Sequence, residues 1–297
     1  MNARAAAPVR HDVTFAADPD RPEAGSLAGH LYLPADHDGT PLPAVVVTGA
    51  WTTIKEQMPG RYAGELAARG YAALAFDFRG WGASEGEPRF LEDPERKTRD
   101  IVAAAAFLAT RREVAPGRVA GLGICASAGY MCAAAAHSKD IRAVGLVAPW
   151  LHDAGIVREV YGGADGVAQL IAKGRAAAAA DSPVVIEAAS TTNSEALMFE
   201  APYYTEPERG QIPEYDNAFN VASWEPWPTF DAVRIADELT KPLLAVHSQA
   251  AAIPAGLETF ASRMGEHARV VWLDEVTQFD FYDRDDAVER AADEVAR

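Results

Sequence analysis

The chain opens with two short segments in which apolar and polar residues alternate. His11–Ala17 and Ser26–Leu33 follow this period of two, and a stretch rich in Pro and Asp separates them. Alternation of this kind is typical of strands with one buried face, and Pro, Gly and Asp favour the turn between such strands. We therefore expect a β-hairpin at the start of the chain.

Continuous apolar runs then alternate with segments of helical period. The runs PAVVVTG and YAALAFD are typical of strands buried on both faces of a parallel sheet. We expect a helix from Pro59 to Gly70 and an amphipathic helix over Arg96–Arg111. Further expected elements are strands at Ala143–Ala148, Pro242–His247 and Val270–Leu273, and helices at Pro254–Met264 and Ala287–Val295. This alternation predicts an α/β fold, a mostly parallel sheet with helices on both faces.

The alternation lapses from about Trp150 to Ala236. This segment contains an Ala-rich stretch, Gly174–Asp181, that predicts a helix, followed by an aromatic region interrupted by Pro. In open α/β sheets ligands bind beyond the carboxyl ends of the strands, where such an insertion forms a cap. We predict an α/β core of residues 1–149 and 237–297 and a cap or lid of residues 150–236. The cap aromatics fit pocket walls for an apolar or aromatic acyl group and core packing equally well.

The sharpest local feature is the segment RVAGLGICASAGYM at residues 118–131, which passes from strand to helix without a loop. So abrupt a turn needs small residues two positions before and after its apex, which is the pattern of a nucleophile elbow. Two registers fit: Cys125 between Gly123 and Ser127, or Ser127 between Cys125 and Gly129. We favour Cys125, because the strand hydrophobics end at Ile124 and Gly allows a closer approach than Cys.

A Cys at this turn stands at a helix N-terminus, whose free N–H groups and dipole are expected to lower the thiol pKa. The alternative is a buried structural Cys in an ordinary strand–turn–helix connection. The only other cysteine, Cys132, lies seven residues further along the same expected helix. That separation is about 10 Å along the helix axis, too far for a disulfide, and it favours a reducing cytoplasm.

Composition narrows the classes of function. The hydrophobic fraction of 49% and charged fraction of 24% are those of a globular protein, and a net charge of −16 argues against nucleic acid or an anionic membrane as partner. We expect the first residues of the chain, which lack an apolar core, not to be a signal peptide, and the sequence has no apolar run of 18 residues. We expect a cytoplasmic protein that acts on a small molecule without metal or cofactor, and we leave a homodimer open.

Six segments of the chain resemble the α/β-hydrolase superfamily. They are VVVTGAWTTIKEQM, AFDFRGWGASEG, GICASAGY, APWLHD, IPEYDNAFNVASWEPW and VTQFDFYD, and they extend over most of residues 43–283. The resemblance is to the dienelactone-hydrolase-like branch, in which Cys replaces Ser at the elbow, and within it to the YcjY-like group. It implies an α/β-hydrolase fold with an inserted cap. It also implies a triad: the elbow nucleophile, an acid after Pro242–His247 and a His after Val270–Leu273.

The sequence departs from this triad at two positions. Where the acid would stand, HSQAAAIP offers only Ala250–Ala252, and where the His would stand, VTQFDFYD offers Gln278. A Ser without a general base is nearly inert, whereas a Cys is partly thiolate at neutral pH. The departures therefore disfavour Ser127 much more than Cys125, and they leave room for a base from elsewhere.

Two of the seven His residues are expected at carboxyl ends of strands, His152 and His247. We expect His247 to make a structural hydrogen bond. His152 follows the strand next to the elbow strand, and Asp153 beside it could orient an imidazole. His152 is our candidate general base or substrate contact, and the alternative is a polar residue at the root of the cap.

An oxyanion hole needs two N–H groups, which we assign to Ala126 after the nucleophile and to Trp51 or its neighbour Thr52. Glu56 in the same loop is expected either to hold the resting thiol, as the resemblance implies, or to begin a surface helix. We expect Asp77 and Arg79 to form a structural ion pair or turn, or to line the pocket. The residues assigned to substrate binding are Gln278, Glu56, Trp150, Trp224 and Tyr282.

The leading interpretation is a hydrolase of an ester, lactone or thioester with Cys125 as nucleophile. Gln278 could orient substrate or water, but a neutral amide cannot act as general base. One alternative is a cyclase, lactonising enzyme or lyase acting on a polyketide-like substrate, because loss of the deacylating His suits a site that avoids water. Another is a ligand-binding protein without catalysis.

Overall fold

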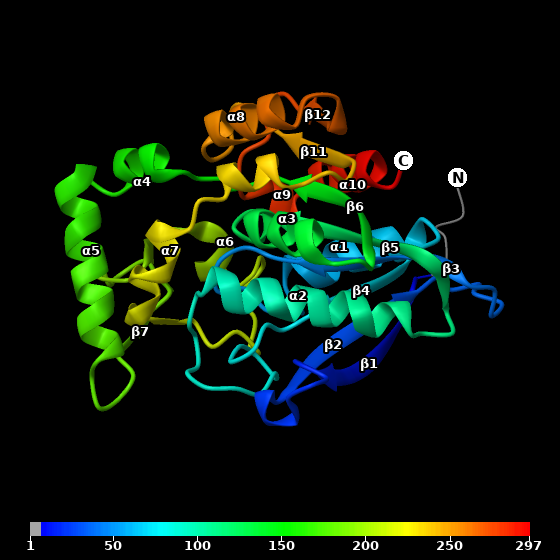
Figure 1. Ribbon diagram of the computed structural model, residues 1–297, viewed down its shortest axis with the longest axis horizontal. Helices are drawn as coiled ribbons and strands as arrows, with labels where there is room; N and C mark the ends of the chain where they lie inside the picture. The colour runs from blue at the N-terminus through cyan, green and yellow to red at the C-terminus, as the bar shows by residue number, and fades with distance from the viewer. Residues whose placement is uncertain (1–6) are drawn as a thin grey trace.

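The computed structural model describes residues 7–297, and its centre is an eight-stranded sheet of order β1-β2-β4-β3-β5-β6-β11-β12 (Figure 1). The strands are β1 (Val9–Ala16), β2 (Ser26–Leu33), β3 (Leu42–Thr48), β4 (Ala72–Phe76), β5 (Val114–Ile124), β6 (Ile141–Val147), β11 (Leu243–His247) and β12 (Ala268–Trp272). β2 pairs antiparallel with both β1 and β4, and the remaining pairs are parallel. The predicted hairpin and mostly parallel sheet are confirmed.

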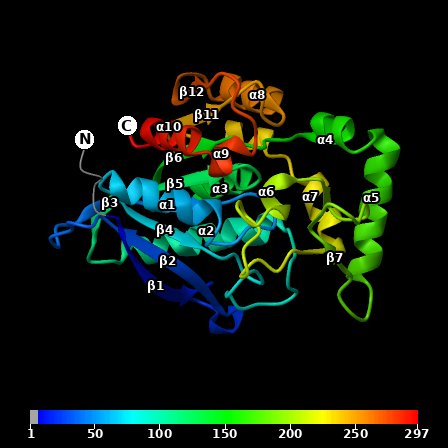
Figure 2. The ribbon, with the colours of Figure 1, turned by 180° about the vertical axis from the view of Figure 1, so that it is seen from behind.

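Helices cover both faces of this sheet. α1 and α10 pack together on one face, and α2 and α3 pack together on the other (Figures 1 and 2). The core helices are α1 (Met58–Ala68), α2 (Pro94–Ala109), α3 (Ser127–His137), α8 (Pro254–Met264), α9 (Asp280–Asp283) and α10 (Asp285–Val295), with 3-10 turns η1 (Pro22–Ala24), η3 (Val233–Asp237) and η4 (Gly265–His267). Each core element expected from the sequence is present within a few residues of its expected bounds. No helix of residues 7–297 is both long and apolar enough to cross a membrane.

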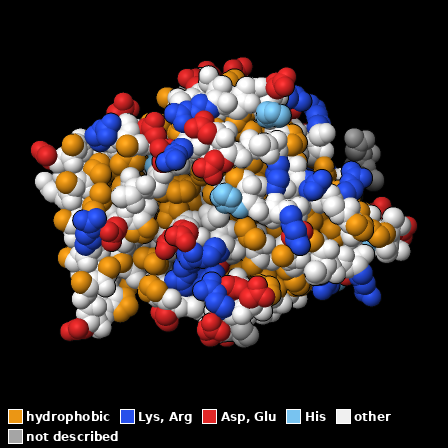
Figure 3. Space-filling model, in the orientation of Figure 1, with side chains coloured by type: hydrophobic (Ala, Val, Ile, Leu, Met, Phe, Trp, Pro, Cys, Tyr) orange, Lys and Arg blue, Asp and Glu red, His pale blue; other side chains and the backbone are white. Residues whose placement is uncertain are grey.

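The lid lies beyond the carboxyl ends of the parallel strands, on the left in Figure 1. Its elements are α4 (Ala154–Val160), α5 (Gly163–Ala178), β7 (Val185–Glu187), β8 (Ala189–Ser190), β9 (Met198–Phe199), α6 (Pro202–Thr205), β10 (Ala218–Asn220), η2 (Val221–Trp224) and α7 (Pro226–Thr229). β7 pairs antiparallel with β10, and β8 pairs parallel with β9. Hydrophobic side chains are frequent on its outer surface, on the left in Figure 3. The bounds 150–236 stay a prediction.

The Ala-rich helix of the lid is longer than its composition predicts, since α5 begins at Gly163, eleven residues before the expected start at Gly174. Glycines make this stretch resemble a loop, but Val167, Leu170 and Ile171 form an apolar stripe at helical spacing. Gly174 has a packing reason: a Cβ there would lie 2.6 Å from the backbone nitrogen of Glu225. The glycine thus lets η2 lie directly against the helix.

Candidate active site

Cys125 lies at the apex of the turn between β5 and α3. β5 ends at Ile124 and α3 begins at Ser127, and Cys125 has a φ of +56°, a left-handed conformation that is strained for a residue with a Cβ. A Cβ at Gly123 would lie 2.8 Å from the Cα of Ala128, so the turn requires a glycine at that position. A strained apex with a small residue two positions before it is the geometry of a nucleophile elbow.

Ser127 lies in the first turn of α3 and is fully buried. Its hydroxyl donates to the carbonyl of Ile124 over 3.1 Å and accepts from the N–H of Ile124 over 3.1 Å. Both hydrogen-bonding functions of the hydroxyl are therefore used to hold the turn closed. Of the two registers open from the sequence, this geometry fits the one with Cys125 at the apex.

Cys125 lines a cavity of about 360 Å³ under the lid. The other lining residues, from core loops and from the lid, are Trp51, Ala126, Trp150, Val160, Tyr161, Leu197, Met198, Tyr204, Trp224, Trp227, Ala252, Gln278, Phe279 and Tyr282. None of these residues is charged and none is a His. A concave, mostly apolar cavity of this volume with a few polar groups is typical of a small-molecule site.

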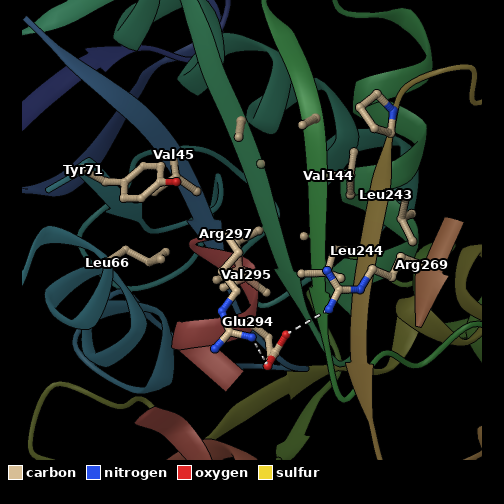
Figure 4. A pocket seen from close by; sticks show the side chains of 16 residues that line it. Val45, Leu66, Tyr71, Val144, Leu243, Leu244, Arg269, Glu294, Val295 and Arg297 are labelled. Carbon is tan, nitrogen blue, oxygen red and sulfur yellow. Dashed lines mark hydrogen bonds and ion pairs between the residues drawn. The ribbon is translucent and has the colours of Figure 1, made fainter. Parts of the chain in front are cut away.

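A second cavity, of about 420 Å³, lies against the face of the sheet that α1 and α10 cover (Figure 4). Its wall includes Glu294, whose carboxylate accepts from Arg297 over 2.8 Å and from Arg269 over 3.4 Å. Its lining residues include no Cys, Ser, Thr or His. The cavity at Cys125 is therefore the candidate active site.

Four of the five residues expected to contact substrate line the cavity at Cys125: Gln278, Trp150, Trp224 and Tyr282. Glu56 is the exception. Its carboxylate lies 2.7 Å from the Nζ of Lys55, and the residue lines a different hollow, together with Arg209. The expectation that Glu56 holds the resting thiol is wrong, because an ion pair holds its side chain outside this cavity.

Asp77 and Arg79 do not pair with each other. Asp77 is fully buried and its Oδ2 accepts from the Nζ of Lys55 over 2.7 Å, whereas the Nε of Arg79 donates to Asp100 over 3.0 Å. Neither residue lines the cavity at Cys125. The loop between β4 and α2 is thus held by two separate buried ion pairs.

His152 does not have the geometry of a general base. Trp150 Nε1 donates to its Nδ1 over 3.0 Å, so the ring proton is on Nε2, which donates to the carbonyl of Trp227 over 3.2 Å. Burial lowers the pKa of His152 to about 4, and the residue does not line the cavity. Asp153 caps α4 by accepting from the N–H of Gly155 over 2.8 Å. The assignment of His152 as base is wrong, because both ring nitrogens are occupied at the root of the lid.

His247 has the structural role expected of it. It is fully buried at the end of β11, and its Nε2 lies 3.2 Å from the carbonyl oxygen of Ala252. Burial lowers the pKa of this imidazole to about 4. His247 is therefore neutral at physiological pH and bound to the loop that follows its strand.

Gln278 connects three loops at the carboxyl edge of the sheet. Its Oε1 accepts from the N–H of Ala252 over 3.0 Å, and its Nε2 donates to the carbonyl of Ala148 over 3.0 Å and to the hydroxyl of Tyr282 over 2.9 Å. The loops after β6, β11 and β12 are thereby fixed relative to one another.

The thiol of Cys125 is protonated at neutral pH. Burial raises its pKa to about 11, and the nearby polar groups of Tyr282, Ala126 and Gln278 only partly oppose this rise. At pH 7 the thiolate fraction is then about one part in ten thousand. The expectation of a lowered pKa is wrong, because the cost of desolvating the thiolate exceeds the benefit of the helix N-terminus.

Ala126 and Trp51, the residues assigned to the oxyanion hole, both line the cavity together with Cys125. Neither the N–H of Ala126 nor that of Trp51 donates to a backbone carbonyl of the described chain. The Trp51 ring packs on Trp227 of the lid, with the ring centres 4.3 Å apart. The adjacent Thr52 has a φ of +61°, and its hydroxyl lies 2.6 Å from that of Tyr215. This loop is held firmly against the lid.

Sequence reasoning missed part of the cavity wall. Val160, Leu197, Met198 and Phe279 line the cavity without having been singled out. The first three belong to lid segments that are short and irregular and lack the periodicity that would have identified them, and Phe279 belongs to the loop after β12. Of the aromatic residues in the predicted cap, Trp150, Tyr161, Tyr204, Trp224 and Trp227 line the cavity.

Comparison with known proteins gives a family match over residues 25–220, to the family described as X-Pro dipeptidyl-peptidase (S15 family). The match includes the elbow and most of the lid. It ends before β11, so Ala252 and Gln278 lie outside it.

Three curated relatives match segments of the chain. The uncharacterised proteins PA2218 of Pseudomonas aeruginosa and YcjY of Escherichia coli are each 40% identical, over 119 and 123 residues. The thiohydrolase aneE of Aspergillus aculeatus is 32% identical over 123 residues. These segments cover 40%, 41% and 41% of this chain and 32%, 40% and 37% of the relatives. The chain therefore spans well under half the length of the curated relatives it matches.

Solved structures extend the likeness to the whole fold. The structure of PA2218 from Pseudomonas aeruginosa has a TM-score of 0.84 at 27% identity, covering 98% of this chain and 92% of that one. The α/β hydrolase GrgF of Penicillium has a TM-score of 0.76 at 21% identity, covering 96% and 97%. Est1E of Butyrivibrio proteoclasticus, with ferulic acid bound, has a TM-score of 0.63 at 17% identity, covering 96% and 100%. The predicted fold and the likeness to YcjY are confirmed.

Proposed function

The chain belongs to the X-Pro dipeptidyl-peptidase (S15) family of the α/β-hydrolase superfamily, and from this premise we propose that it is an esterase- or thioesterase-type enzyme with Cys125 as nucleophile. The observation that carries the proposal is the position of Cys125, at a strained elbow that opens onto an apolar cavity. Ala126 and Trp51, which line the same cavity and whose N–H groups donate to no backbone carbonyl of the described chain, support the same chemistry.

In the proposed reaction the sulfur of Cys125 attacks the carbonyl carbon of an ester, lactone or thioester. A carbon–sulfur bond forms, and the bond to the leaving oxygen or sulfur breaks. The thiol proton ends on the leaving atom, so charge balances. The N–H groups of Ala126 and Trp51 stabilise the oxyanion of the tetrahedral intermediate. Water then cleaves the acyl–sulfur bond and regenerates the thiol.

The cavity wall favours an uncharged, apolar acyl group. Its lining consists of Trp, Tyr, Phe and aliphatic side chains around Cys125 and Gln278, with no residue to pair a charged substrate. The name of the thiohydrolase relative supports a thioester as one substrate class. The ferulic acid held by a protein of the same fold supports an aromatic acyl group.

The peptidase activity in the family description does not fit these residues. An amide nitrogen is a poor leaving group that must be protonated, a task that a triad His performs in serine peptidases. At the two triad positions outside the family match this chain carries Ala252 and Gln278. No cavity-lining carboxylate is present to bind a peptide amine. Ester and thioester bonds, which cleave more easily, are therefore the proposed substrates.

One observation favours acyl transfer or lactonisation as a second candidate function. None of the cavity-lining residues is a His or carboxylate that could activate water for deacylation. An acyl-enzyme that reacts slowly with water persists long enough for a hydroxyl of a second molecule, or of the acyl chain itself, to attack it. The product is then an ester or a lactone instead of a free acid.

A substrate panel tests the proposal. p-Nitrophenyl esters and aryl thioesters are assayed with wild-type protein and with Cys125→Ala, and Cys132→Ala is the matched control, since Cys132 is buried in α3. We expect turnover in wild type and Cys132→Ala and its loss in Cys125→Ala. Adding alcohols separates the two functions, because a transferase forms the new ester faster than the free acid. Full turnover in Cys125→Ala contradicts the proposal.

A further inference from the structure

We propose that Tyr215 of the lid is a positioning residue for the oxyanion hole: its hydroxyl, hydrogen-bonded to that of Thr52, holds the adjacent N–H of Trp51 where the oxyanion forms. This inference rests on the proposed function, because an oxyanion forms only if Cys125 attacks a carbonyl. Neither Tyr215 nor Thr52 lines the cavity, whereas Trp51 does. Tyr215 therefore acts on the reaction through the loop that carries Trp51, and not by touching the substrate.

The backbone of this loop is strained at Thr52. The residue has a φ of +61°, in the left-handed region. A β-branched side chain is a rare outlier there, because its branched Cβ crowds the neighbouring backbone. Such a conformation persists only where the surrounding contacts determine it. The contacts of Thr52 therefore also fix the direction of the peptide groups on either side of it.

The contact that holds the Thr52 side chain comes from the lid. Thr52 is fully buried, and Tyr215, between α6 and β10, is 8% exposed. Their hydroxyl oxygens lie 2.6 Å apart, a short O–H···O hydrogen bond in which either oxygen can be the donor. The two residues are 163 positions apart in the chain. The strained residue is thus held by a distant segment and not by its own loop.

A second tyrosine of the lid bonds the same peptide. The hydroxyl of Tyr204, in α6, donates to the carbonyl of Trp51 over 3.4 Å. This carbonyl and the N–H of Thr52 belong to one planar peptide group, so the plane is held at its carbonyl by Tyr204 and beyond its nitrogen by Tyr215. The bond from Tyr204 is the longer and weaker of the two. Tyr204 also lines the cavity, so Tyr215 offers the cleaner test.

The far end of the loop is bonded to the same part of the lid. The Nε2 of Gln57 donates to the carbonyl of Gly210 over 2.6 Å. The N–H of Met58, the first residue of α1, donates to the hydroxyl of Tyr203 over 2.9 Å. The loop over residues 51–58 is therefore attached to the lid at both of its ends.

This attachment has a consequence for the proposed chemistry. A donor of an oxyanion hole must lie about 2.7–3.1 Å from the place where negative charge develops, so a small displacement of the N–H of Trp51 weakens it. Without the hydroxyl of Tyr215, that of Thr52 is buried without its partner and Thr52 relaxes from its strained conformation. The peptide of Trp51 then moves with it. The lid thus completes the oxyanion hole from outside the cavity.

Ester turnover tests the role of the bond. Hydrolysis of a p-nitrophenyl ester is measured for wild type, Tyr215→Phe, Thr52→Val and the double variant. We expect kcat and kcat/KM of each single variant to fall by a similar factor, about 10-fold or more, because the oxyanion exists only along the reaction and not in the bound substrate. Since both substitutions remove one bond, the double variant should match the single variants. Additive losses, or a loss confined to KM, overturn the inference.

Alkylation of the thiol separates the oxyanion hole from a general disturbance of the site. Iodoacetamide reacts by displacement of iodide at a CH₂ group, so no oxyanion forms. We expect Cys125 of Tyr215→Phe and of Thr52→Val to be alkylated within about twofold of the wild-type rate. Alkylation that falls together with ester turnover overturns the inference.

Tyr62→Phe is the matched control for loss of a buried tyrosine hydroxyl. Tyr62 is fully buried in α1, and its hydroxyl donates to the carbonyl of Phe281 over 2.8 Å, without a bond to the loop or to the lid. We expect its kcat/KM to stay within about threefold of wild type. Equal losses in Tyr62→Phe and Tyr215→Phe overturn the inference.

Thr52→Ser tests the same bond by rescue, because serine keeps the hydroxyl. We expect Thr52→Ser to retain kcat/KM within about threefold of wild type, whereas Thr52→Val loses it. If Tyr215→Phe does not fold, this comparison decides the inference. Equal activity of Thr52→Ser and Thr52→Val overturns it.

Cys125→Ala, assayed beside these variants, separates failure of this inference from failure of the proposed function. If Cys125→Ala and wild type turn over esters equally, or neither does, the proposed function fails and this inference fails with it. If Cys125 is required and Tyr215→Phe behaves as Tyr62→Phe does, this inference alone fails and the proposed function stands.

Discussion

The backbone N–H of Ala252 donates to the Oε1 of Gln278 over 3.0 Å. These two residues stand in the loops after β11 and β12, where the resemblance to α/β-hydrolases implies the triad acid and His. A pair that is normally charged is here replaced by a peptide group and a neutral amide. The contact between the two loops is kept, whereas the ability to accept the thiol proton is lost.

This replacement predicts a simple pH dependence for the thiol. Because the pKa of Cys125 is raised to about 11, the thiolate fraction rises tenfold per pH unit over the range below that value. We expect the rate of alkylation by iodoacetamide to rise about tenfold per unit from pH 7 to 10 without a plateau. Mass mapping should place the adduct on Cys125 and not on Cys132, which is fully buried. A plateau below pH 9 would show a lowered thiol pKa instead.

His152 predicts a loss of stability in acid. Its pKa is lowered from 6.5 to about 4 by burial, so below about pH 6.5 the unfolded chain binds a proton that the folded chain does not. The free energy of unfolding should therefore fall from pH 6.5 to 4, by about 1.4 kcal/mol per pH unit for this group. Urea denaturation at a series of pH values gives this free energy for wild type and His152→Gln. In the variant it should fall less steeply with decreasing pH, by that amount, since Gln does not titrate. An identical slope would refute the neutral buried imidazole.

We expect removal of Lys97 alone to lower the free energy of unfolding much more than removal of both charges of the buried Glu92–Lys97 pair. Both oxygens of Glu92 lie 2.8 Å from the Nζ of Lys97, and both side chains are almost fully buried. Lys97→Met alone should lower the free energy of unfolding by about 3–5 kcal/mol, because it leaves a buried carboxylate unpaired. Lys97→Met with Glu92→Gln should recover part of that loss.

An exposed pair on the same helix is the control for this prediction. Arg99 and Glu95 of α2 form an ion pair four residues apart with both side chains exposed. Arg99→Met should cost less than about 1 kcal/mol, because water screens the pair. Chemical denaturation of the three variants and the wild type checks both values. Equal losses for Lys97→Met and Arg99→Met would contradict the role of burial.

We expect the aromatic side chains of the lid to determine which acyl groups the enzyme accepts. Trp224 lines the cavity and its ring lies against those of Trp51 and Phe219, with centres 5.9 Å and 5.7 Å away. Trp224→Ala should lower kcat/KM for an aromatic acyl ester by about tenfold or more, relative to the acetate ester. Trp272→Ala is the control, since Trp272 is 38% exposed on the edge strand β12. A similar change in both variants would place the acyl group outside the lid.

Much of the fold followed from periodicity. Buried parallel strands have continuous apolar runs, as in β3 and β4, and a helix start can carry a local signal such as Pro59 in the first turn of α1. The elbow could also be predicted from the sequence, because its strained apex requires a glycine two positions earlier, at Gly123. The predicted start of α5 was too late because glycine occurs both in loops and at close contacts between elements. At Gly174 it allows a close helix contact and does not mark a loop.

The chemistry of the site was less predictable. His152 and Glu56 belong to the right loops, but sequence does not show which way a side chain turns, and hydrogen bonds to Trp150 and Lys55 turn them away from the cavity. The thiol pKa was misjudged because the helix N-terminus is a local feature, whereas desolvation depends on lid residues far away in the chain. No pattern in the sequence around Cys125 indicates that the lid buries its thiol.

Trapping the acyl-enzyme tests the central claim most directly. Wild-type protein, Cys125→Ala and Cys132→Ala are mixed with a p-nitrophenyl ester, quenched in acid within the first turnover, and measured by intact mass followed by peptide mapping. We predict an adduct of the acyl mass on Cys125 in wild type and Cys132→Ala, and none in Cys125→Ala. An adduct on another residue, or unchanged turnover in Cys125→Ala, would contradict the account.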